Sequence, residues 1–247
     1  MRILISNDDG YLAEGINILA KQLSKKHQVT IFAPSENKSA ASSSLTIDRP
    51  LKPRKISESV YTIDGTPSDS SHFALCGYFK EDFDLVISGI NFGPNLGDDV
   101  IYSGTVAAAI EGRFVGYPSI AISLASWDGL NFDSAAQVAE MIVENVEFSK
   151  LSINTVLNVN VPDVPYSEIK GFISTRLGSR HKSENIIQDK KDPLLYWIGE
   201  NGKEDKNGPG TDFHAIKNNY VSITPLKVDL TSTEELTLVS DWIEGMV

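Results

Sequence analysis

The feature that most constrains this fold is a short apolar strand that ends at two adjacent acids. Arg2–Ser6 reads RILIS, and a polar cluster with Gly10 follows at once. Such a run is typical of a central parallel strand that is buried on both faces. In open α/β sheets, ligands gather outside the carboxyl ends of the strands. Asp8 and Asp9 are therefore expected at the edge where such folds carry out their chemistry.

The acid pair indicates a metal site. Adjacent carboxylates repel each other unless a proton or a cation lies between them, and hard oxygen ligands suit a divalent ion such as Mg²⁺ or Mn²⁺. The alternative is an Asx turn or a helix N-cap, because Asp is common at turns. Our working prediction is a metal site at the end of the first strand.

Charge and cysteine content restrict the partners and the compartment. The 247 residues carry a net charge of −11 with a pI of about 4.8. This argues against nucleic acid or an anionic membrane as a partner, since both need a basic surface. Cys76 is the only cysteine, no signal-peptide pattern is evident, and no window approaches the roughly 18 apolar residues of a membrane span. We therefore expect a cytoplasmic protein.

Strands and helices alternate over residues 1–165. Apolar runs predict further strands at 29–33, 84–88, 119–124 and 156–161, and periodic or capped segments predict helices at 16–23, 66–79, 106–112 and 135–146. This order predicts an α/β fold, a three-layer Rossmann-like architecture with a mostly parallel sheet. Two short strands at 45–47 and 60–63 are expected to form a hairpin-like excursion.

Residues 166–247 have a different character. The stretch 172–225 lacks helical periodicity and carries turn signals between segments such as 194–198 and 220–223. We expect an antiparallel β-hairpin arm that pairs with another subunit, because a projecting hairpin has little core of its own. A capping box at 231–234 predicts a terminal helix. The chain is thus expected to be one structural unit, with a core at 1–165 and an oligomerisation extension at 166–247.

Three strand ends are predicted to bring oxygen donors together. Asp8 and Asp9 follow the first strand, Ser39 lies in the polar loop after the second, and Asn91 and Asn95 follow a third. Carboxylate, hydroxyl and carboxamide oxygens suit Mg²⁺, Mn²⁺ or Ca²⁺. Each neutral residue also has a plainer interpretation, as a loop serine or as a turn asparagine in the left-handed region.

The turn at Ser103, Gly104 and Thr105 comes directly before an Ala-rich helix. Free N–H groups and the positive dipole end of a helix favour an anion such as phosphate. Ser103 and Thr105 could equally be plain N-caps, and the two roles are compatible.

Two charged groups are open to more than one interpretation. Asp98 and Asp99 lie in a Gly-rich loop, where a solvated or capping role is the better interpretation. Arg176, Arg180 and His181 form a basic group that could hold a substrate phosphate or lie in a solvated loop. No G-x-G-x-x-G follows the first strand, and neither a P-loop nor a G-x-S-x-G motif occurs.

The motifs NDDG, SGIN-x-GPN and SGTV-x-A, with the Ser39 loop, resemble the SurE family of metal-dependent phosphatases, the stationary-phase survival proteins that act as 5′/3′-nucleotidases. The resemblance continues through the GTP turn at 65–67 and through RLGSRH, GPGTDF and YVSITPL, so it covers essentially the whole chain. One departure is Ser70, where relatives often have Cys. That residue is interpreted as helix packing.

The resemblance implies specific roles for eight residues. The metal ligands would be Asp8, Asp9, Ser39 and Asn91, and the phosphate pocket would include Asn95, Ser103, Gly104 and Thr105. It also implies a cytoplasmic enzyme with one Mg²⁺ or Mn²⁺ per subunit that prefers nucleoside 5′- and 3′-monophosphates and sometimes cleaves short polyphosphate. A homodimer or homotetramer that exchanges C-terminal segments is expected.

The expected mechanism is in-line attack of an ion-activated water on phosphorus. Asp8 or Asp9 would orient or deprotonate that water, and the sequence does not choose between them. Asp8 as a covalent nucleophile is a minority option. The alternative function is a non-catalytic nucleotide-binding protein or a receiver-like signalling module.

Overall fold

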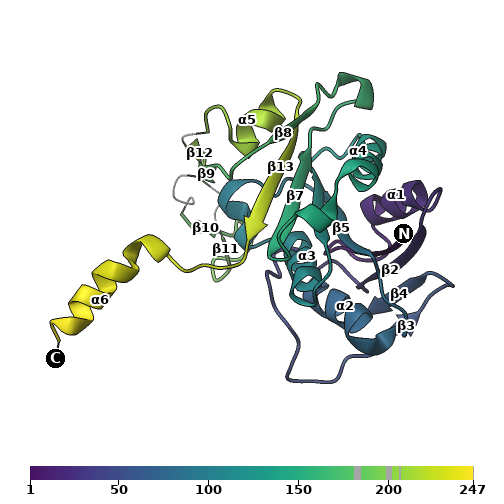
Figure 1. Cartoon of the computed structure of the whole chain (residues 1–247), viewed down its shortest axis with the longest axis horizontal. Coiled ribbons are helices and arrows are strands. Elements are labelled where there is room, and N and C mark those ends of the chain that lie inside the picture. Colours follow the sequence, from purple (N-terminus) through teal and green to yellow (C-terminus); the bar gives the residue numbers. More distant parts are fainter. Residues whose placement is uncertain (181–184, 199–201, 206, 247) are drawn as a thin grey trace.

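A computed structural model describes residues 1–180, 185–198, 202–205 and 207–246. Its centre is a nine-stranded sheet with the order β3-β4-β2-β1-β5-β6-β7-β13-β8 (Figure 1). The strands are β1 (Arg2–Ser6), β2 (Gln28–Pro34), β3 (Arg54–Lys55), β4 (Val60–Ile63), β5 (Leu85–Phe92), β6 (Ser119–Leu124), β7 (Thr155–Val161), β8 (Phe172–Ser174) and β13 (Val221–Lys227). From β4 to β7 along the sheet, neighbouring strands are parallel, so their carboxyl ends lie at one edge.

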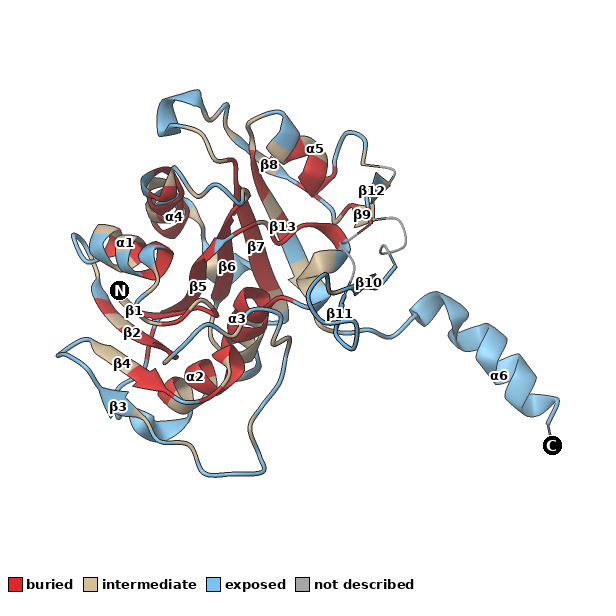
Figure 2. Ribbon diagram, turned by 180° about the vertical axis from the view of Figure 1, so that it is seen from behind, coloured by how far each residue is buried: buried red, intermediate tan, exposed pale blue. Residues whose placement is uncertain are grey.

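Helices cover both faces of this sheet. Contacts pair α1 (Glu14–Leu23) with α4 (Phe132–Asn145), and α2 (Pro67–Phe73) with α3 (Gly104–Phe114), on opposite sides. Successive side chains of β1 point to opposite faces of the sheet, which explains both layers. Ile3 and Ile5 pack in the core that includes α1 and α4, whereas Leu4 packs in a separate core with Phe32. Buried residues concentrate in these layers (Figure 2). The predicted three-layer α/β architecture is confirmed.

Local signals predicted several elements correctly. The Thr66 hydroxyl accepts a hydrogen bond from Asp69 N at 3.0 Å, and Thr66 N donates to Asp69 Oδ2 at 2.8 Å, which is the reciprocal capping arrangement that starts α2. Ser103 likewise caps α3, since its Oγ accepts from Val106 N at 3.1 Å. Side-chain oxygens therefore define both helix starts.

The predicted strand at 45–47 is wrong. Thr46 instead gives its backbone N–H and its hydroxyl to the Asp69 carboxylate, at 2.9 and 2.6 Å, so this segment binds a helix start and not another strand. The second predicted strand exists as β4. It pairs in parallel with β2 inside the main sheet, and β3 is its antiparallel partner.

The sheet continues beyond residue 165. β13 pairs antiparallel with β7, and β8 pairs in parallel with β13. The sequence did not predict α5 (Asp212–Lys217), which precedes β13 and is capped by the Thr211 hydroxyl. Two small antiparallel pairs complete this part: β9 (Ser179–Arg180) with β12 (Glu204–Asp205), and β10 (Ile187–Gln188) with β11 (Tyr196–Trp197). The last pair is a hairpin within the stretch where an antiparallel arm was predicted, whereas β8 and β13 of the same stretch join the main sheet; pairing of the hairpin with another subunit stays a prediction.

The terminal helix α6 (Leu236–Glu244) extends away from the layered body (Figure 1). The predicted capping box at 231–234 is wrong, because a 3₁₀ turn over Thr233–Glu235 precedes α6 and neither helical start has a side-chain cap. Thr231 N donates instead to Asp229 Oδ1 at 2.9 Å. None of the helices in the described residues has the length and apolar character needed to cross a membrane.

Candidate active site at the carboxyl edge of the sheet

The sheet order brings the three predicted strand ends side by side. β1 pairs with β2 on one side and with β5 on the other. Asp8 and Asp9 follow β1, the loop at 35–44 follows β2, and Asn91 lies near the end of β5. All three segments meet at the carboxyl edge because these strands are parallel.

Asp8 lies between the Ser39 loop and the start of α3. It is 4% exposed, and the Thr105 hydroxyl donates a hydrogen bond to its Oδ1. Lys38 N donates to the Asp8 carbonyl at 2.7 Å, which holds the loop against it. Gly104 is so close that a Cβ placed on it would lie 2.7 Å from the Asp8 Cβ. The carboxylate therefore adjoins the amino end of the helix.

Asp9 is only half-buried, and its hydrogen bond goes to the end of β5 and not to α3. Its Oδ2 accepts a hydrogen bond from Phe92 N at 3.1 Å, which ties the acid to the end of β5. It also lines an open cavity of about 360 Å³. Of the two acids, Asp9 is thus the one that an entering molecule can reach.

The acid pair has no cationic side chain as an ion-pair partner in the part of the chain that is described. Burial raises the pKa of Asp8, and burial together with the Asp8 charge raises the pKa of Asp9 to about 6. Within the described residues, neither carboxylate forms an ion pair with Lys, Arg or His. A divalent cation bound between the two acids would neutralise the charge of both carboxylates.

The neutral donors fit such a cation. Asn91 is buried, and its Nδ2 donates to Gly93 O at 2.8 Å, which fixes the amide and leaves Oδ1 without a hydrogen-bond donor among the described residues. Ser39 is exposed, and its Oγ donates to Asn37 Oδ1 at 2.7 Å. In the part of the chain that is described, no group of three His, Cys, Asp or Glu side chains could hold a metal. An ion at Asp8 and Asp9 would therefore need these neutral oxygens.

The anion site that the sequence predicts falls at the amino end of α3. Ser103 is its N-cap, Thr105 is fully buried, and the helix begins at Gly104. The first N–H groups of a helix have no partner inside the helix and carry partial positive charge. An anion bound here would lie beside Asp8, which requires a cation between the two.

Asn95 has a structural role that the sequence did not reveal. Its N donates to Asn160 Oδ1 at 2.9 Å, and its carbonyl accepts from the Nδ2 atoms of Asn158 and Asn160, both at 2.9 Å. Its own Nδ2 donates to Ser123 Oγ at 2.8 Å. Asn158 and Asn160 therefore hold the loop that follows β5. Their alternation with buried apolar residues in β7 was the available signal.

The acids of the Gly-rich loop bind Arg180, which differs from the solvated or capping role that we expected. Asp99 Oδ2 lies 2.8 Å from the Arg180 guanidinium, and Asp98 Oδ2 accepts from Arg180 N at 2.8 Å. Arg180 is thus engaged within the protein. His181, which the sequence grouped with it, lies outside the described residues.

Asp212 is a further buried acid that sequence reasoning missed. Its two oxygens accept from Gly97 N and Gly178 N, each at 2.7 Å, and Oδ1 also accepts from Phe213 N at 2.9 Å. The carboxylate therefore fastens the loop after β5 to the C-terminal part of the chain.

Comparisons with known proteins agree with this arrangement. The family described as Survival protein SurE matches residues 3–184. The chain is 62% identical over its full length to a protein named 5′-nucleotidase SurE from Vesicomyosocius okutanii subsp. Calyptogena okutanii, covering 99% of that protein. It is 63% identical over 98% of both chains to one of the same name from Ruthia magnifica subsp. Calyptogena magnifica. A crystal structure of SurE protein from Aquifex aeolicus matches with a TM-score of 0.88 and 41% identity, covering 99% of this chain and 100% of that one. The chain belongs to the SurE family.

Proposed function

We propose that this chain is a metal-dependent phosphomonoesterase that hydrolyses nucleoside 5′- and 3′-monophosphates to the nucleoside and phosphate. The observation that supports the proposal is the contact of Asp8 with the start of α3, because a carboxylate that would hold a cation then adjoins N–H groups that would bind an anion. The name 5′-nucleotidase SurE, which its relatives carry, supports the substrate class. Short polyphosphate, which also ends in a phosphoryl group, is included as a second substrate.

The cation, one Mg²⁺ or Mn²⁺ per subunit, would be held by Asp8, Asp9, Ser39 and Asn91. When bound, a divalent ion neutralises phosphoryl charge and lowers the pKa of water. The oxygen-only donor set and the raised pKa values of both acids support this assignment. We therefore expect activity to depend on the added metal.

The chain's own groups position the reacting phosphate. The N–H groups at Gly104 and Thr105 would bind phosphoryl oxygens, with the Ser103 turn and the Asn95 loop closing the pocket. The Thr105 hydroxyl holds Asp8 in place. Asp9 lines the open cavity, so we assign it the contact with the attacking water, which it would orient and from which it would accept a proton.

The direct test is to replace each acid by its amide. Asp8→Asn and Asp9→Asn should lower nucleoside monophosphate hydrolysis by at least about 100-fold while circular dichroism stays unchanged. Asp133→Asn, at an exposed acid in the first turn of α4, is the matched control and should keep parental activity. EDTA should abolish parental activity, and Mn²⁺ should restore it.

Either variant turning over substrate at the parental rate would refute the site assignment. A parent that binds AMP but does not hydrolyse it with any divalent ion would identify a non-catalytic nucleotide-binding protein instead.

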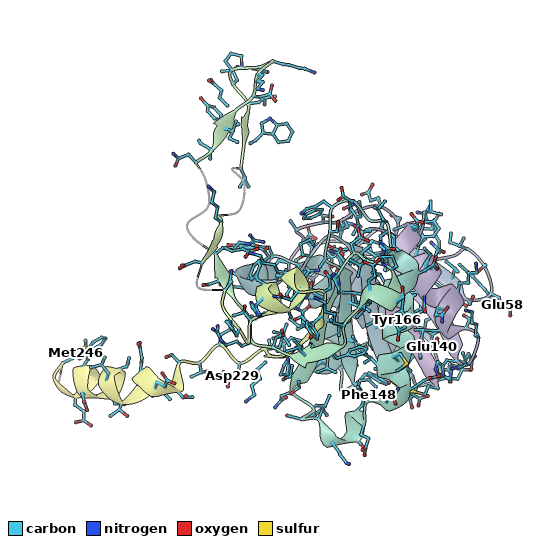
Figure 3. The ribbon with its side chains drawn as sticks, turned by 90° about the horizontal axis from the view of Figure 1, so that it is seen from above. Glu58, Glu140, Phe148, Tyr166, Asp229 and Met246 are labelled. Atoms are coloured by element: carbon cyan, nitrogen blue, oxygen red, sulfur yellow. The ribbon has the colours of Figure 1, made fainter. Side chains whose placement is uncertain are left out.

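We further propose that residues 166–247 join copies of the chain into a homodimer or homotetramer. The hairpin of β10 and β11 and the helix α6 both extend beyond the body (Figure 3). The helix exposes its apolar side chains at Leu236, Leu238, Val239, Trp242 and Ile243. An isolated chain rarely leaves such a surface uncovered. The cytoplasmic location expected from the sequence remains a prediction, as does the absence of nucleic acid and membrane partners.

A further inference from the structure

Phe92 and Trp127 form an exposed aromatic pair beside the acid pair. Phe92 is 42% exposed and Trp127 is 69% exposed, and their ring centroids lie 5.9 Å apart at an interplanar angle of 77°. Phe92 occupies the position x of the SGIN-x-GPN motif, and Trp127 lies in the loop after β6. Large aromatic side chains at this exposure offer π-faces to a ligand.

Both rings lie directly over glycines. A Cβ on Gly93 would lie 2.4 Å from the Trp127 ring, and a Cβ on Gly129 would lie 2.6 Å from the Phe92 ring. The rings therefore occupy space that only glycine leaves free. Phe92 is also tied through its backbone N–H to Asp9 Oδ2. The backbone of Phe92 is thus connected directly to the proposed reaction centre, and Trp127 lies against the Phe92 ring.

The open cavity at Asp9 extends to Phe92, and Trp127 lies outside its lining, against the Phe92 ring. Its lining residues are Asp9, Ala13, Glu14, Gly15, Asn37, Phe92, Asp128, Gly129 and Phe132. Its volume of about 360 Å³ falls within the usual range for small-molecule sites. Phe92 and Phe132 contribute apolar lining, and the exposed acids Glu14 and Asp128 also line the cavity. The cavity therefore combines surfaces for stacking with hydrogen-bond acceptors.

The dimensions suit a nucleotide. Asp9 follows β1, Phe92 ends β5, and Trp127 follows β6, so the strands that carry the aromatic pair lie one and two strand spacings, about 5 and 10 Å, from the strand that carries the acids. This is the scale of the separation between phosphate and base in a nucleoside monophosphate. A phosphate at α3 would leave the base free to reach the aromatic pair.

We propose that this cavity is the nucleobase subsite and that it favours bases with an exocyclic amino group. The proposal rests on the proposed function and adds the residues that recognise the substrate. Stacking on Phe92 and Trp127 would hold any base, whereas an amino group would donate a hydrogen bond to Glu14 or Asp128. Among the described residues, the acids here do not form a metal-binding group of three, so a second cation site is not the better interpretation.

The test separates base binding from phosphate chemistry. Steady-state kinetics are measured with AMP and with ribose 5-phosphate, which has no base. Phe92→Leu and Trp127→Leu should each raise KM for AMP about 5- to 100-fold, while kcat and KM for ribose 5-phosphate stay within about 2-fold of the parental values. Trp127→Phe should keep most of the affinity for AMP. Phe114→Leu, at an exposed phenylalanine at the far end of α3, is the matched control.

The amino-group preference is tested with AMP against IMP, which carries an oxygen in place of the amino group. The parent should favour AMP in kcat/KM by about 10-fold, and Glu14→Gln combined with Asp128→Asn should shrink that ratio. Equal use of AMP and IMP by the parent would overturn the preference. An unchanged KM for AMP in both leucine variants, or an equal loss with ribose 5-phosphate, would overturn the subsite.

A binding measurement keeps the subsite testable without turnover. Adenosine added in EDTA should quench tryptophan fluorescence in the parent, and the quench should be lost in Trp127→Leu. If the parent hydrolyses neither phosphate ester but adenosine still quenches through Trp127, the proposed function fails and the subsite stands. If the parent is active and adenosine quenches both proteins equally, the subsite assignment fails.

Discussion

Gly104 leaves no space for a side chain next to Asp8. A Cβ built on Gly104 would lie 2.7 Å from the Asp8 Cβ and 2.9 Å from its Oδ2, closer than real Cβ atoms approach. The backbone of α3 thus touches a buried carboxylate at the point where the helix has free N–H groups. In the proposed function, this close approach brings the metal-binding acid and the phosphate-binding helix end to one edge.

Gly104→Ala should therefore impair catalysis. The added methyl group would push the first turn of α3 away from Asp8, and a displacement of about 1 Å at a reaction centre can cost about 100-fold in rate. We expect kcat/KM for AMP to fall 10- to 100-fold. Gly208→Ala is the control, because a Cβ there meets no atom within 4 Å. Full activity in Gly104→Ala would mean that the contact does not matter for turnover.

Thr105→Val should weaken the hold on the Asp8 carboxylate, because it removes the hydroxyl that donates a hydrogen bond to it. Asp8 Oδ1 accepts its side-chain hydrogen bond from Thr105, which is fully buried. A hydrogen bond to a charged group contributes about 1.5–3 kcal/mol, so we expect about 10- to 150-fold weaker activity or Mn²⁺ affinity. Thr105→Ser keeps the hydroxyl and should retain most of both. Titration of activity against Mn²⁺ measures the effect, and equal behaviour of the Val and Ser variants would contradict it.

The sequence could predict the layered fold and the position of the acids because both depend on local patterns. An apolar run such as Arg2–Ser6 can be buried only inside a covered sheet, and parallel strands bring their carboxyl ends to one edge. Asp8 and Asn91 therefore lie at the same edge of the sheet, after neighbouring strands. The helix starts at Thr66 and Ser103 could be predicted for the same reason, since the side chain of each N-cap residue accepts a hydrogen bond from the first turn of its helix.

What the sequence could not predict depends on contacts between distant segments. The strand expected at 45–47 gives its hydrogen bonds to Asp69, 23 residues away from Thr46. Asn95 is held by Asn158 and Asn160, whose role requires the adjacency of β7 and the loop after β5. Residue type alone does not reveal such partners.

The acid pair predicts a distinctive dependence of stability on pH in metal-free protein. Asp9 has a pKa of about 6 in the folded chain, against 3.8 for an ordinary carboxyl, because of burial and the Asp8 charge. The folded state then binds a proton more tightly than the unfolded state. The contribution of the protonated Asp9 to the stability of the folded state is therefore complete below about pH 4 and is lost as the pH rises through 6.

In EDTA, Asp9→Asn should be more stable than the parent at pH 8, and the difference should vanish near pH 4. After allowance for the partial exposure of Asp9, we expect a gap on the order of 1 kcal/mol, or about 2–4 °C in Tm. Asp133→Asn should show no such trend. Saturating Mn²⁺ should reverse the order at pH 8 by stabilising only the parent. A parent that gains stability over Asp9→Asn as the pH rises in EDTA would contradict the pKa assignment.

The exposed face of α6 gives the last prediction. Trp242 is 58% exposed and Val239 is 41% exposed on a helix that leaves the body of the protein (Figure 2). If a second copy covers this surface, a charge placed in it would be buried without a partner, which is strongly unfavourable. Trp242→Glu should therefore reduce the mass measured by light scattering to that of a single chain. Ile56→Glu, at an exposed apolar residue next to β3, should leave the mass of the parent assembly unchanged. A Trp242→Glu protein that keeps the parental mass, or a parent that is itself a monomer, would rule out α6 as the assembly surface.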